Sequence, residues 1–223
     1  MGARAARANL GPGLALLAFA AALLIGYYTV SPVTAALDAI GTLKTRFGLG
    51  FAVVSTCLFG AVLPALIQRA LGRPAHPRLT HFLVVAAFWS VVGVEVDLLY
   101  RLQSLVFGDG RDPLTLTLKV FVDMGIWVPL WAAPTTVALY QWNDLRHRVP
   151  GAVPFRASGT LRRWYAGRVV PMVISNNAVW TPSVFIIYAL PPALQLIVMN
   201  LILCFWSLIV ALQTRDGAGE APA

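Results

Sequence analysis

Five charged residues lie inside two long apolar runs of this 223-residue sequence, and their types and spacing could support chemistry or transport. They are Glu95, Asp97, Arg101, Lys119 and Asp123. Asp97 and Arg101 are four residues apart, as are Lys119 and Asp123, so each pair can share one helix face. A charge at the centre of a bilayer costs about 2.5–3.5 kcal/mol. We therefore expect these side chains to pair with one another or to meet water.

Two interpretations of these charges stay open. In the first, they form a buried network that joins the helix of residues 81–107 to the helix of residues 114–140, with Arg101 and Asp123 meeting across the interface. In the second, they line a polar pathway for a solute or ion, and Glu95 is the charge without an evident partner. An intramembrane enzyme that uses one of these carboxylates as acid or base is a weaker alternative.

The composition indicates which elements must position these residues. The chain is 58% hydrophobic and 12% charged, with a mean hydropathy of +0.74, whereas soluble domains carry about 25% charged residues. Apolar runs long enough to cross a core of about 30 Å cover residues 10–30, 47–71, 81–107 and 114–140. The last run, 169–212, is too long for one straight span. These runs predict an all-α polytopic transmembrane bundle of about five or six membrane segments.

Prolines interrupt the last run, so we expect its helix to be broken between Pro182 and Pro191–Pro192. The run at residues 10–30 is longer than the apolar part of a signal peptide, which favours a retained helix. Residues 31–47 are mixed in character and predict a short amphipathic connector. The polar tail at residues 214–223 is expected to be disordered.

A basic stretch, residues 141–168, separates the fourth run from the last. An interfacial helix here would set aromatic rings in the headgroups and arginines against anionic lipid; its candidate contacts are Arg162, Arg163, Trp164 and Arg168. An ordinary positively charged inside loop is the simpler interpretation, and a protein-docking site is a third.

The Lys and Arg residues of the loops predict an orientation. With the N-terminus inside, eleven of them fall on the inner side and three on the outer side. An apolar run that begins by residue 10 suits a bacterial inner membrane, with the mitochondrial inner membrane as the alternative. The formal net charge of +8 resides mostly in these short loops, so we expect lipid rather than nucleic acid as the partner. A homo-oligomer is compatible with the sequence.

The sequence offers no recognisable site for a metal or cofactor. Cys57 and Cys204 lie within apolar runs and predict small core residues rather than a disulfide. No Cys/His cluster has the spacing of zinc ligands, and no phosphate-binding loop or metalloprotease motif occurs. We expect no metal, no cofactor and no enzymatic activity.

Three motifs resemble those of the Mpv17/PMP22 family of small organellar and bacterial membrane proteins (the peroxisomal PMP22, not the myelin protein). The family pattern Gly-Pro-x-x-His-x-Trp-Tyr resembles residues 93–100, where Gly93 and Tyr100 match and Asp97 replaces the His. The pattern Lys-x-x-x-Asp-Gln with a following Pro is similar to Lys119, Asp123 and Pro129, with Met124 in place of Gln.

The third motif, at the C-terminus, carries most of the resemblance. Its members are Trp180, Pro182, Pro191, Asn200 and Phe205-Trp206. About one residue is deleted between the prolines, and Gln195 stands where the family has Arg. The resemblance covers roughly residues 47–212, so residues 47–213 form the family-like membrane domain and residues 1–46 add an N-terminal helix and connector. It implies about four spans and a channel for small solutes; the alternative is a scaffold that docks partners or lipid through the basic loop.

Overall fold

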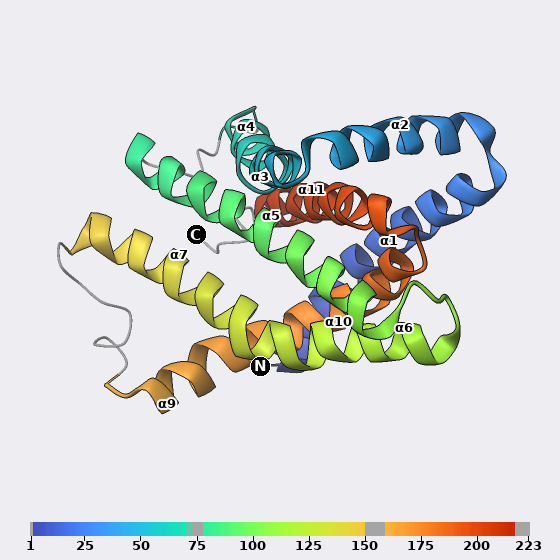
Figure 1. Ribbon diagram of the computed structural model, residues 1–223. Coiled ribbons are helices and arrows are strands. Elements are labelled where there is room, and N and C mark those ends of the chain that lie inside the picture. Colours follow the sequence, from blue (N-terminus) through green and yellow to red (C-terminus); the bar gives the residue numbers. More distant parts are fainter. Residues whose placement is uncertain (1, 71, 73–77, 150–158, 217–223) are drawn as a thin grey trace.

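The structure, a computed structural model, describes residues 2–70, 72, 78–149 and 159–216. Every regular element in these ranges is a helix, which confirms the predicted all-α class (Figure 1). Four continuous helices are long and apolar enough to cross a membrane. The first is built from α3 (Leu49–Cys57), η1 (Leu58–Val62) and α4 (Leu63–Ala70). The second is α5 (Leu79–Phe107).

The other two of these four helices are also composite. One joins α6 (Pro113–Val120), η2 (Phe121–Ala132) and α7 (Ala133–Arg148); the other joins α9 (Leu161–Trp164), η3 (Tyr165–Val169) and α10 (Val170–Tyr188). The η segments are π-helical turns, wider than α turns. Since α9 and η3 are the first turns of a 28-residue apolar helix that is long enough to be a span, the basic residues 161–168 continue directly into that helix and do not form the separate interfacial helix that the sequence suggested.

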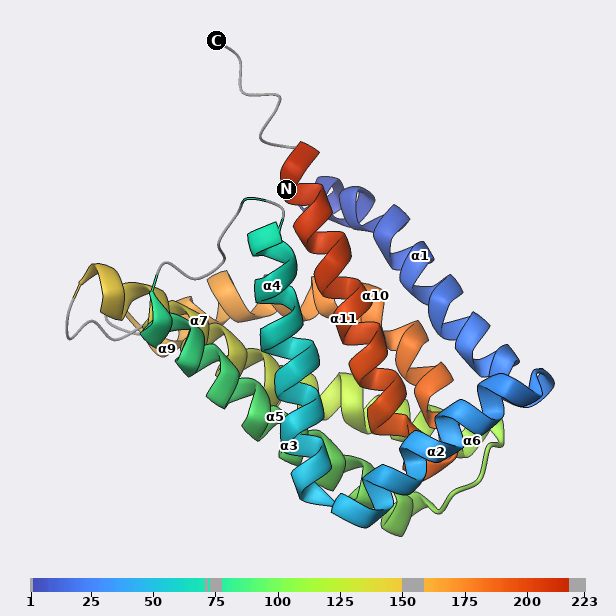
Figure 2. The same ribbon diagram turned by 90° about the horizontal axis from the view of Figure 1, so that it is seen from above.

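The N-terminal region folds into two helices, α1 (Gly2–Thr29) and α2 (Ser31–Phe47). They meet at an angle of 100° and together count as a fifth candidate span, broken or re-entrant. The total of four or five agrees with the lower end of the predicted range. Residues 31–47 are a full 17-residue helix rather than a short connector. Its buried face holds Leu37, Gly41 and Lys44, and α2 lies across the ends of α3 and α11 (Figure 2).

The predicted proline break lies between α10 and α11 (Pro192–Asp216). Pro191 precedes α11, and Pro192 occupies its first position, where a missing backbone N–H has no consequence. Pro182, by contrast, lies inside α10 without ending it. Helix α11 also continues through Asp216. Residues 214–216 are therefore helical and not part of a disordered tail, and the rest of the predicted tail lies outside the described residues.

Helix α11 is the centre of the bundle. Seven consecutive residues, 194–200, are buried, and a run that covers every side of a helix requires neighbours all around it. Helix α11 contacts α1, α2, α3, α4, α5 and α10, and Figure 2 shows it between α1 and α4. Its polar residues are satisfied in part within the bundle, because Asn200 Nδ2 donates to Ser55 Oγ at 3.0 Å.

Helices α3 and α5 pack closely because Gly93 lacks a side chain. A Cβ atom at Gly93 would collide with the carbonyl oxygen of Ala52 and lie 2.7 Å from Thr56 Oγ1. Small residues at such contacts let helix backbones approach. This packing sets the position of α5, which carries three of the five predicted charges.

A short turn fixes the connection from α5 to α6. Gly108 has φ of +74° and ends α5. Asp112 caps α6 by accepting a hydrogen bond from the Thr115 backbone N–H at 3.0 Å. Hydrogen bonds from the Thr115 side chain and backbone hold the pKa of the Asp112 carboxyl below its ordinary value. The turn makes α5 and α6 neighbours, as the sequence predicted.

Candidate functional site

A cavity of about 590 Å³ lies among η1, α4, α5, η2, α7, α10 and α11. Its volume falls in the range of small-molecule sites, which is roughly 300–1,000 Å³. Most of its wall is apolar. The polar side chains that line it are Gln68, His81, Glu95, Tyr100, Asp123, Thr135, Thr136, Tyr140 and Asn176. The cavity therefore combines a mostly hydrophobic surface with a few polar groups, as ligand sites do.

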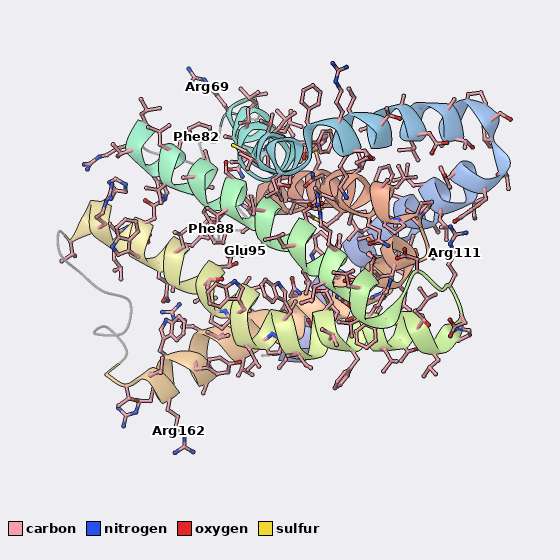
Figure 3. All side chains as sticks on the ribbon, in the orientation of Figure 1. Arg69, Phe82, Phe88, Glu95, Arg111 and Arg162 are labelled. Atoms are coloured by element: carbon pink, nitrogen blue, oxygen red, sulfur yellow. The ribbon has the colours of Figure 1, made fainter. Side chains whose placement is uncertain are left out.

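Glu95 is the half-buried charge in this wall. In Figure 3 its side chain lies between α5 and α7. None of the described residues donates a hydrogen bond to its carboxylate or forms an ion pair with it within 4.0 Å. In the described part of the chain, the structure thus gives Glu95 no protein counter-charge.

Asp123 is the second carboxylate of the cavity, and it belongs to a chain of hydrogen bonds. Tyr188 donates its hydroxyl to Asp123 Oδ2 at 2.8 Å, and Gln103 Nε2 donates to the Tyr188 oxygen at 2.5 Å. The ring of Tyr100 meets the Tyr188 ring edge to face at 5.2 Å. This chain ties η2, α5 and α10 together beside the cavity.

Lys119 does not pair with Asp123 as its spacing suggested. Its fully buried ammonium lies 3.9 Å from Asp109 Oδ1 and 5.7 Å from the centre of the Tyr188 ring. The π-helical turns of η2 begin at Phe121, between the two residues. Because π turns hold more residues than α turns, positions four apart no longer lie on one face.

Asp97 is neutralised by cations from two helices. Arg101, in the next turn of α5, lies 2.7 Å from Asp97 Oδ2, as the sequence predicted. Lys44 of α2 lies 3.0 Å from Oδ1 and also donates to the Pro192 carbonyl oxygen at 3.2 Å. The network thus joins α5 to α2 and α11. The expected contact of Arg101 with Asp123, which would have joined α5 to η2, is absent among the described residues.

The residues of the family-like motifs have identifiable surroundings. Pro129 lies in η2, and its carbonyl oxygen accepts a hydrogen bond from the Tyr165 hydroxyl at 2.7 Å. Trp180 of α10 lines the cavity. Trp206 belongs to α11, and its side chain lies outside the described residues.

In residues 161–168, the arginines are exposed and the tryptophan is buried. Arg162, Arg163 and Arg168 are exposed, and Arg162 points away from the bundle in Figure 3. Trp164 is only 2% exposed, and its Nε1 donates to Gln141 Oε1 at 2.6 Å. Trp164 therefore joins α9 to α7, and the prediction that it contacts lipid is wrong.

Sequence reasoning overlooked several residues of the site. Lys44 lies in the expected connector of residues 31–47, and nothing in the sequence around it links it to Asp97. Tyr188 and Gln103 could have been noticed as polar residues within apolar runs. Trp89 and Tyr140 line the cavity, and Trp89 Nε1 donates to the Tyr140 oxygen at 3.1 Å. In the sequence, nothing distinguishes these two aromatic residues from the others in the apolar runs.

Comparison of the chain with family models, with curated proteins and with solved structures finds no match. The motif resemblance therefore depends on the residues themselves.

Proposed function

We propose that the chain is a multi-pass membrane protein that passes a small solute through the cavity lined by Glu95 and Asp123. The observation that carries the proposal is the unpaired carboxylate of Glu95 in the cavity wall. A carboxylate within a membrane span is costly unless it meets a counter-charge, water or a solute. With no protein cation beside Glu95 among the described residues, water or a solute in the cavity would stabilise its charged form.

The neutral polar groups of the wall support the same function. Thr135, Thr136 and Asn176 offer hydrogen bonds from two different helices, which a passing solute can exchange for its hydration. The motif resemblance to the Mpv17/PMP22 family, whose members are thought to form small channels, adds a second line of support. Within this proposal the membrane is the bacterial inner membrane and the N-terminus lies inside.

Solute flux through reconstituted liposomes tests the proposal. We expect Glu95→Gln and Asp123→Asn to change the flux of small solutes roughly tenfold, since each removes a charge that the pathway presents to the solute. Stopped-flow light scattering with neutral, cationic and anionic solutes measures the change. Asp144→Asn is the matched control, because Asp144 lies outside the cavity and pairs with Arg148 at 3.1 Å.

The result that would contradict the pathway is unchanged flux in both cavity variants while thermal unfolding shows them to be folded. A wild-type protein that passes no solute of the panel would also contradict it.

A scaffold function is the second candidate, and the exposed arginines of α9 and η3 favour it. Arg162, Arg163 and Arg168 could hold anionic headgroups or an acidic partner without any solute movement. Replacement of these three arginines by Gln should then weaken binding to vesicles or partners and leave the cavity unaffected.

A further inference from the structure

We propose that the cavity binds a small organic cation, one that carries an alkylammonium or guanidinium group. This inference names the solute class of the pathway proposed above and rests on that pathway. Three features of the described residues carry it: the charge of the wall, its aromatic rings, and the way in which those rings are held.

The charge of the wall is negative. Glu95 and Asp123 line the cavity, and no Lys or Arg is among the described lining residues. The two lysines that are buried among the described residues have other partners: Lys44 binds Asp97 and Pro192, and Lys119 faces Asp109 and the Tyr188 ring. Two carboxylates in a low-dielectric wall without a protein counter-charge favour a positively charged occupant.

The aromatic content of the wall favours an organic cation in particular. Five rings line the cavity: Trp89, Tyr100, Trp127, Tyr140 and Trp180. The faces of Trp and Tyr rings attract cations, and aromatic cages that recognise quaternary ammonium groups use this attraction. The apolar remainder of the wall suits the alkyl part of such a solute.

The rings on α5 and α7 are held before any solute arrives. The Trp89 indole donates to the Tyr140 hydroxyl at 3.1 Å. On its other side, Trp89 packs against Gly60, where any Cβ atom would collide with the indole ring. A ring fixed by a hydrogen bond and by close packing loses little freedom when a ligand binds.

A metal ion fits this wall less well than an organic cation. Calcium and magnesium ions require six or more oxygen ligands, whereas the charged oxygen donors of the wall come from only two carboxylates. Within the part of the chain that the structure describes, no three His, Cys, Asp or Glu side chains come together as metal ligands.

A binding experiment with choline and its neutral isostere, 3,3-dimethylbutan-1-ol, tests the proposal. The two molecules share shape and size and differ in charge. The full chain in lipid nanodiscs is titrated with each by isothermal calorimetry. We expect choline to bind at least about tenfold more tightly, because only choline gains from the carboxylates and the ring faces. Equal affinity, or no binding of choline up to millimolar concentrations, overturns the cation site.

Matched variants locate the binding. Glu95→Gln and Trp127→Leu should each weaken choline binding roughly tenfold. Asp144→Asn and Trp142→Leu should leave it unchanged, since Trp142 lies on α7 beside Arg146 and does not line the cavity. If the control variants weaken binding as much as the cavity variants, choline binds elsewhere and the proposal fails. If Glu95→Gln does not fold, Trp127→Leu and the comparison of choline with its isostere still decide whether the cavity binds the cation.

The flux and binding measurements test the pathway and the cation site separately. Choline binding without solute flux overturns the pathway and supports the cation site. Flux without preference for choline over its isostere overturns the cation site and supports the pathway.

Discussion

The Asp97 carboxylate shows which factors decide whether a charge within these helices finds a counter-charge. It is fully buried, and it meets one cation from its own helix and one from α2. The Arg101 partner follows from helical spacing and is readable in the sequence. The Lys44 partner is not readable, because it depends on the path of α2 across the ends of α3 and α11. Lys119 and Asp123 fail to pair for a related reason, since no sequence rule marks where π turns begin.

Removal of the Asp97 charge should destabilise the fold strongly. Asp97→Asn leaves Lys44 without its counter-ion in a nearly buried site, and breaking a buried pair in this way costs about 3–5 kcal/mol. Arg101→Gln should cost much less, because the Arg101 side chain is 55% exposed and Lys44 remains as the counter-charge of Asp97. Unfolding in mixed micelles measures both variants.

Equal losses in the two variants would contradict this view of Asp97. The control is Asp144→Asn, since the pair of Asp144 and Arg148 is exposed on both sides and should contribute little.

The helices of the bundle are less regular than their sequences suggest. Three of the four long helices contain a π-helical segment. Pro129 lies inside η2, and Pro64 follows η1 by two residues. A proline removes one backbone donor and crowds the preceding turn, and a wider turn relieves both effects. Pro64 and Pro129 therefore indicate that the backbone is perturbed near them, although they do not mark the residue at which the π turns begin. The sequence does not predict whether a helix continues, as at Pro182, or ends, as at Pro191, because packing against neighbours decides that.

The contact of α3 with α5 should be sensitive to one methyl group. Gly93→Ala forces the new Cβ against the Ala52 carbonyl oxygen, and overpacking of this kind costs roughly 1–3 kcal/mol. Gly50→Ala, on α3 itself, meets no atom within 4 Å and should be neutral or stabilising by roughly 0.5–1 kcal/mol. Thermal unfolding in detergent compares the two. Destabilisation by Gly50→Ala equal to that by Gly93→Ala would mean that helix propensity, and not the close approach, governs the site.

At the scale of the whole molecule, the sequence predicts the class of protein but not how its helices pack. An apolar excess that cannot be covered by 12% charged residues indicates a polytopic helical membrane protein before any helix is placed. The central position of α11 is not indicated, because its sequence is no more apolar than those of α5 or η2. The cavity is likewise beyond sequence reasoning, since residues from seven elements line it.

The ends of the bundle carry different charges, and this difference predicts the orientation. Arg69, Arg146 and Arg162 belong to the end at which α4 and α7 finish and α9 begins. The opposite end, with α2 and the turn before α6, carries Lys44, Arg46 and Arg111 together with acidic residues. Figure 3 shows Arg111 and Arg162 far apart on the molecule. Because Lys and Arg are retained on the inner side of a membrane, we expect the arginine-rich end to face inward.

Thiol labelling of single-cysteine variants measures this orientation. In a background of Cys57→Ser and Cys204→Ser, which removes both free thiols, Arg111→Cys and Asp144→Cys place one thiol at each exposed end. In sealed right-side-out vesicles, an impermeant maleimide should modify the first variant at once and the second only after the membrane is opened. The opposite pattern would reverse the orientation. Equal labelling of both would exclude a single orientation, because in any one orientation the two thiols lie on opposite sides of the membrane. Only the orientation with the arginine-rich end inside agrees with the distribution of Lys and Arg.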